Sequence, residues 1–240
     1  MLNNLVCDQL GPFQWFADRS KRRVFLLGHS CWSYLFSKLA GRQLKIEIPA
    51  YLALLAGVLP DFDIYFKPLI QHHTYTHSLI ILLPICAILT IRFKGVGLAF
   101  SAGLLSHLVA DSLVGFVPPL YPLSDFQLGL GLGLPSPADT ALEIGALALV
   151  VALAYFNGDY KLVTQPNKQG AYLAIPMVSI VTLTLLFAGD NPNIPLVSFA
   201  FSRKALTLIT LGHIVLVGLL GIGVFQGARA IKAKRTGTSV

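Results

Sequence analysis

Three long apolar runs constrain the fold of this chain more than any other feature of its sequence. They cover residues 96–117, 171–188 and 205–225, and each approaches the roughly 20 residues that a helix needs to cross a bilayer. Charged residues make up 12% of the chain, whereas soluble domains carry about 25%. The chain lacks the charge that a water-facing surface requires, and we predict a polytopic integral membrane protein of the all-α class.

Shorter apolar segments set the expected number of membrane segments. Residues 75–91 and 141–156 are long enough to span, whereas residues 48–59 reach part way or continue beyond Pro60. Residues 24–40 are interrupted by polar side chains, so this segment either spans or is re-entrant. We predict a transmembrane helical bundle with six or seven membrane segments, and we slightly prefer six.

Residues 117–138 interrupt the helical pattern with five prolines and with glycines at every second position from Gly129 to Gly133. Such a composition predicts one long Pro/Gly-rich loop. The loop contains no lysine or arginine, whereas residues 229–235 contain four. By the positive-inside rule, the C-terminus lies in the cytoplasm and the loop lies outside it. The side of the N-terminus stays open, because it depends on whether residues 24–40 span.

The net charge of +7 comes from short basic clusters between the apolar runs. This placement is typical of membrane-protein loops, so we expect membrane lipids as partners and no nucleic acid. We divide the chain into an N-terminal extension (1–23), a membrane core that carries the polar motifs described next (24–122), and C-terminal membrane helices with a basic tail (123–240). The predicted location is the cell membrane.

Histidine and aspartate gather in a few short motifs, although ionisable groups in apolar segments are costly and need a partner or a purpose. His107 and Asp111 lie four residues apart inside the run 96–117. On a helix this spacing places both side chains on one face, where an imidazole nitrogen and a carboxylate oxygen can bind one ion. A simpler interpretation is a hydrogen-bonded pair that holds two helices together.

His73 and His77 repeat this spacing where the segment 75–91 begins, and His72 precedes them. Solvation at a helix end is the simpler interpretation for all three. Asp61 and Asp63 follow Pro60, and an extended turn would send the two carboxylates to opposite sides. One of them could then bind a metal while the other orients a histidine.

His29 stands alone in an apolar stretch, where a histidine is more often structural than a metal ligand. The predicted topology nevertheless places the aspartate motif, His77 and the His107/Asp111 pair at the same, non-cytoplasmic face. We therefore predict one shared site for one or two divalent metal ions. Mixed imidazole and carboxylate ligands favour Zn²⁺, with Mn²⁺ or Fe²⁺ as alternatives. The predicted metal ligands are His29, Asp61, Asp63, His73, His77, His107 and Asp111.

These motifs, in this order and followed by Pro119-Leu-Tyr-Pro122, resemble the YdjM-type family of membrane-bound metal-dependent hydrolases across residues 28–122. One departure is Thr74, which stands where such proteins often carry an arginine. The motif order is also distantly similar to zinc-dependent phospholipase C. That likeness implies that Asp111 bridges two ions and that His29 helps to hold the second.

We therefore expect metal-assisted hydrolysis of a phosphoester in a lipid or a lipid-linked substrate. Asp63 or His72 would act as the general base. Two other functions stay open at this point. One is transport of metal ions or protons, which also uses intramembrane histidine and aspartate. The other is a non-catalytic membrane protein with a structural metal.

Overall fold

The computed structural model describes residues 26–67, 69–132, 136–190 and 204–236, and these residues form helices and loops without a β-strand. The all-α class is confirmed. The predicted extension 1–23 lies outside the described residues. The principal helices are α2 (Leu26–Gln43), α3 (Ala50–Leu55), α4 (Leu79–Val114), α5 (Pro137–Phe156), α7 (Ala174–Asp190) and α9 (Lys204–Thr236). Short helical turns connect them: η1 (Pro60–Phe66), η2 (Tyr75–His77), α6 (Lys161–Thr164) and η3 (Lys168–Leu173).

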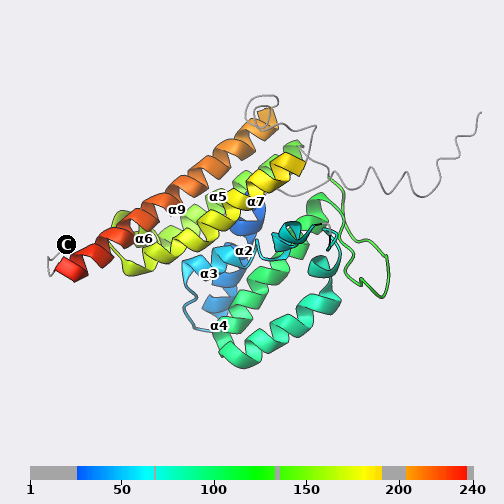
Figure 1. The fold of residues 1–240 in the computed structure, drawn as a ribbon, viewed down its shortest axis with the longest axis horizontal. Coiled ribbons are helices and arrows are strands. Elements are labelled where there is room, and N and C mark those ends of the chain that lie inside the picture. Colours follow the sequence, from blue (N-terminus) through cyan, green and yellow to red (C-terminus); the bar gives the residue numbers. More distant parts are fainter. Residues whose placement is uncertain (1–25, 68, 133–135, 191–203, 237–240) are drawn as a thin grey trace, which may run out of the picture.

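Four helical segments are long and apolar enough to cross a membrane, namely Leu79–Val114, Pro137–Phe156, Lys168–Phe187 and Lys204–Thr236. Figure 1 shows α5, α7 and α9 running side by side, and contacts of both α5 and α7 with α9 agree with this view. The chain is therefore a multi-pass membrane protein. The predicted count of six or seven segments is not confirmed, because α2 is too polar to qualify and α3 has only six residues.

A sharp turn at Lys94 divides α4 into two arms, residues 79–93 and 95–114. Lys94 has φ 52° and ψ −129°, outside the helical region, and Figure 1 shows α4 as two arms that diverge from a sharp turn. A Cβ at Gly97 would lie 2.1 Å from the carbonyl oxygen of Leu89, so only glycine permits this close approach. The arms correspond to the segments that the sequence predicts at 75–91 and 96–117.

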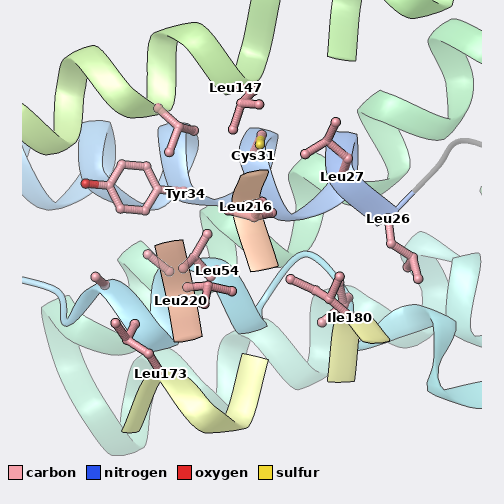
Figure 2. Packing of buried hydrophobic residues seen from close by; sticks show 14 of the residues in the cluster. Leu26, Leu27, Cys31, Tyr34, Leu54, Leu147, Leu173, Ile180, Leu216 and Leu220 are labelled. Carbon is pink, nitrogen blue, oxygen red and sulfur yellow. The ribbon is translucent and has the colours of Figure 1, made fainter. Parts of the chain in front are cut away.

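The main apolar core lies where α2 meets α3, α5, α7 and α9. Figure 2 shows Leu27 and Cys31 of α2 packed with Leu147 of α5, Ile180 of α7 and Leu216 of α9. In a membrane, van der Waals packing rather than escape from water holds such helices together. This core fixes α2, the helix that carries His29.

Small residues bring α2 against the second arm of α4. A Cβ at Gly103 would lie 2.1 Å from Ser37 Oγ and 2.7 Å from Ser33 Oγ. Close approach through small residues is the usual packing mode of membrane helices. The serines that make α2 too polar for a simple apolar span are thus the surface on which α4 packs.

Candidate metal centre

Five histidine and aspartate side chains from four elements converge in the interior of the protein. They come from α2 (His29), η1 (Asp61), η2 (His77) and the second arm of α4 (His107 and Asp111). Each of these residues is at most 2% exposed. Asp111 lies three residues before α4 ends at Val114, so the cluster is near one end of a membrane segment.

Two imidazoles and two carboxylates form the centre of this cluster. The Nε2 atoms of His77 and His107 are 3.0 Å apart. Asp111 Oδ2 lies 3.4 Å from the first Nε2 and 3.2 Å from the second. Asp61 Oδ1 lies 3.4 Å and 3.6 Å from the same two nitrogens.

Hydrogen bonds at the Nδ1 atoms of both rings determine whether the Nε2 atoms donate or accept. His107 Nδ1 is 2.6 Å from the carbonyl oxygen of Gly57, which only accepts, so this nitrogen carries the proton. Thr76 Oγ1 donates to Asp63 Oδ2 at 2.6 Å and lies 2.9 Å from His77 Nδ1, which therefore donates to the hydroxyl. In both neutral rings Nε2 is then a lone-pair acceptor that faces the carboxylates.

With both rings neutral, four acceptors point at one another with no protein hydrogen between them. Asp111 Oδ2 is buried and receives no hydrogen bond from any residue that the structure describes. Such a set of facing acceptors is unfavourable in the protein interior unless a cation or additional protons lie between them. The donor set therefore fits a metal ion.

The separations also fit a particular coordination geometry. Ligand bonds of about 2.0–2.2 Å in a tetrahedron place the donor atoms roughly 3.3–3.6 Å apart. The five separations among His77, His107, Asp61 and Asp111 given above range from 3.0 to 3.6 Å. These values fit metal–ligand geometry. The buried groups His77/His107/Asp111 and His29/Asp61/His107, whose donor atoms lie within 4.8 Å of one another, could each hold a metal ion.

The second oxygen of each carboxylate faces a further histidine. His29 Nε2 lies 3.5 Å from Asp111 Oδ1 and 3.8 Å from Asp61 Oδ2. Its ring stacks on the ring of His107, with centroids 3.9 Å apart. Two overlapping groups of three donors result, His29/Asp61/His107 and His77/His107/Asp111, and three protein donors leave one coordination position open.

Asp63 lies outside this centre and holds His72 in place. His72 Nδ1 is 2.7 Å from Asp63 Oδ1, and His72 Nε2 is 3.8 Å from Asp61 Oδ1. Although burial alone would raise the pKa values of Asp61 and Asp63, the surrounding histidines hold both below their usual range. Asp61 and Asp63 lie in the 3₁₀ turn η1 rather than in an extended turn, and both carboxylates face the rings of His72 and His77 instead of opposite sides.

His73 lies beside the centre, its ring stacked on that of His77 at 4.4 Å. With His72 and His77 it forms a third group of nearby donors. Burial, together with the neighbouring His77, lowers the pKa of His73 to about 3. The expectation that His73 and His77 share a helix face is wrong, because His73 has φ 61° and α4 begins only at Leu79.

Two residues that the sequence does not single out complete the site. Gly57 brings the backbone against α2, where a Cβ would lie 2.1 Å from the carbonyl oxygen of His29, and its own carbonyl orients His107. Thr76 links Asp63 to His77. The hydroxyl within the motif His73-Thr-Tyr-Thr76-His77 is the only sequence signal for this link, and no pattern marks Gly57.

A family model described as the YdjM inner membrane protein matches residues 25–230. The chain belongs to the YdjM inner membrane protein family. This match covers all the donors described above and confirms the resemblance noted in the sequence, whereas the distant likeness to phospholipase C stays a prediction. No curated protein and no solved structure matches the chain. Membership in this family and the four apolar helices agree on a multi-pass membrane protein.

Proposed function

We propose that this protein is a membrane-embedded, metal-dependent hydrolase that acts on the phosphoester of a lipid or lipid-linked substrate. The observation that carries the proposal is a pair of buried three-donor groups, His77/His107/Asp111 and His29/Asp61/His107. Three protein donors leave a coordination position for water or substrate. Catalytic zinc sites have such an open position, whereas structural sites are closed.

The residues around the donors suit this chemistry. A bound divalent ion would lower the pKa of water and polarise the phosphoryl oxygen. With its Nδ1 proton donated to Asp63, His72 presents an unprotonated Nε2 and can accept a proton there. Asp63 then orients the ring and stabilises the imidazolium. The side chain of His72 is only 6% exposed, so its Nε2 faces the interior beside the donors.

The position of the donors supports a lipid substrate. His107 and Asp111 occupy the last two turns of a membrane helix, close to the depth at which lipid headgroups meet the hydrocarbon. A phosphoester at this depth reaches the donors while its acyl chains stay in the bilayer. A freely soluble ester has no such reason to be cleaved within a membrane protein.

Metal analysis combined with a hydrolysis assay tests the proposal. We expect two divalent ions per chain in the full-length, detergent-purified protein, and hydrolysis of a fluorescent phospholipid that stops with a chelator and returns with Zn²⁺ or Mn²⁺. His213→Gln is a matched control, since His213 is buried in α9 and accepts from the backbone of Leu27 rather than facing the donors. This variant should keep the metal. Absence of metal from the freshly purified wild type, even after incubation with Zn²⁺, would refute the proposal.

Asp61 Oδ1 lies 3.4 Å and 3.6 Å from the Nε2 atoms of His77 and His107. This proximity favours a second candidate, a structural metal at which Asp61 joins His77, His107 and Asp111. Four protein ligands complete a tetrahedron and leave no position for substrate. One tightly held ion per chain, with no hydrolysis of any phosphoester, would support this alternative. Loss of folded protein on chelation would support it further.

A further inference from the structure

The loop between α4 and α5 exposes large apolar side chains along its described part, residues 115–132. Leu123 is 79% exposed and Leu130 is 69% exposed. Leu120 and Phe126 are exposed as well. The only charged residue in this stretch is Asp125. An apolar loop of this kind is unfavourable in water and needs a partner.

A second segment with exposed apolar side chains, which also contains Lys67, follows the aspartates of the metal centre. Tyr65 and Phe66 are exposed at the end of η1, and Leu69 is 88% exposed just beyond it. Tyr65 comes only two residues after Asp63. Both apolar segments are therefore joined directly to elements that carry the donors, because the α4–α5 loop follows the arm with His107 and Asp111.

Several contacts hold the loop against the metal centre. Ser78, the residue after His77, donates through its hydroxyl to the carbonyl oxygens of Pro119 and Tyr121. The amide of Leu79 donates to the same Pro119 oxygen at 2.9 Å. The rings of Tyr75 and Tyr121 meet edge to face at 4.8 Å. The loop thus begins beside the residues that position His77.

Lipid is the partner that fits these segments. The loop is continuous at both ends with helices that can cross a membrane, and its described residues carry no lysine or arginine. Irregular backbone is not tolerated against hydrocarbon, so such a loop belongs at the interface. Tyrosine is enriched at the membrane–water interface, and Tyr65, Tyr75 and Tyr121 lie in or next to the two segments.

We propose that Tyr65, Phe66, Leu69, Leu120, Leu123 and Phe126 form an apolar collar that inserts into the lipid leaflet beside the metal centre. The collar sets the substrate class: an amphiphile whose acyl chains remain among the lipids while its polar head enters the site. The statement about the substrate class rests on the proposed hydrolase function, whereas the insertion of the collar into the leaflet is independent of it.

Depth-dependent quenching tests the insertion without any assay of activity. Leu123→Trp would be placed in the full chain with Trp15→Phe and Trp32→Phe and reconstituted into phosphatidylcholine vesicles. We expect brominated acyl chains to quench its fluorescence by about half, as for interfacial side chains. Gln165→Trp, in the exposed turn after α6, is the matched control and should be quenched far less. Equal, weak quenching at both positions would overturn the collar.

Hydrolysis then tests the substrate class. We expect Leu123→Ser combined with Phe126→Ser to lower cleavage of a vesicle-embedded phospholipid about fivefold or more, since apolar anchoring is lost. Cleavage of a water-soluble phosphodiester should be unchanged. Equal loss on both substrates would overturn the role in substrate choice. If Leu123→Trp is quenched but the wild type cleaves neither substrate, the collar stands and the proposed hydrolase function fails.

Discussion

Each end of α2 carries a buried polar cluster, and the two clusters differ in whether the protein itself supplies a cation for the carboxylates. At the end near Lys38, the Nζ atom lies 2.6 Å from Asp159 Oδ2 and 2.8 Å from the carbonyl oxygen of Ile48. Tyr34 donates to the same carboxylate at 2.6 Å. The protein supplies a cation for every buried anion in this cluster, so it needs nothing from solution.

At the other end, His29 enters a cluster in which the protein supplies no such cation. Among the described residues, the ion-pair partners of Asp61 and Asp111 are histidines, and no lysine or arginine pairs with them. The rings of His77 and His107 present lone pairs because their protons are engaged elsewhere. A buried acceptor cluster without its own cation therefore indicates a bound ion more strongly than its amino-acid composition does.

The largest expected effect comes from Asp111→Asn, which keeps the shape of the side chain and removes its charge. Asp111 lies within 3.5 Å of all three central histidines, so we expect both donor sets to weaken together. Metal content should fall below half, and hydrolysis should drop about 10³-fold, equivalent to roughly 4 kcal/mol. Elemental analysis and the phospholipid assay measure the two quantities.

The same substitution separates a metal ligand from a residue that only holds helices together. In the second case, the introduced asparagine side chain would donate a hydrogen bond from its amide to His107 Nε2, and the membrane would lose a charge at little cost. Unchanged metal content and activity, with equal or higher stability, would return the His107/Asp111 pair to that role.

Lys38→Met is expected to affect stability and leave the metal in place. It removes the cation from the self-compensated cluster and leaves the carboxylate of Asp159 unpaired, which costs about 3 kcal/mol in buried pairs. Unfolding in mixed detergent micelles measures this difference. Adding Asp159→Asn to Lys38→Met should recover part of the loss. A drop in metal content instead would mean that the two ends of α2 are coupled and that the comparison is wrong.

Thr76→Val is expected to have the smallest effect of these substitutions, a loss of metal affinity. It removes the hydroxyl that accepts from His77 Nδ1 and leaves the nearest carboxylate oxygen, Asp63 Oδ2, 3.7 Å away. Loss of such an outer partner typically lowers metal affinity about 10- to 100-fold. Competition with a fluorescent chelator measures the affinity. Thr76→Ser, which keeps the hydroxyl, should match the wild type, and equal affinities of the valine and serine variants would exclude this role for Thr76.

Much of the helical layout could be predicted, because the length of each apolar run can be counted in the sequence. The apolar runs at 96–117 and 205–225 lie in α4 and α9, and the run at 171–188 lies in η3 and α7. The number of spans could not be predicted, because α2 combines a helical backbone with a serine-rich packing face. Hydropathy does not distinguish such a face from a loop. The packing of Ser33 and Ser37 against Gly103 identifies it as a packing face.

The candidate site could also be predicted only in part. The spacing of His107 and Asp111 predicts their shared face, because both lie within one continuous helix. The same spacing fails for His73 and His77, since the left-handed backbone at His73 cannot be read from the pattern. Gly57 acts through its backbone carbonyl, a group that every residue has, so the sequence contains no signal for it.

The donors all lie between His29 and Asp111, in the first half of the chain, while α5, α7 and α9 follow them. During synthesis the complete set of donors therefore emerges before the three helices that pack around α2. Until those helices arrive, the imidazoles and carboxylates can still exchange ions and protons with water. An ion acquired at that stage would be enclosed as the later helices insert, so that metal loading becomes a step of membrane assembly rather than an event that follows it.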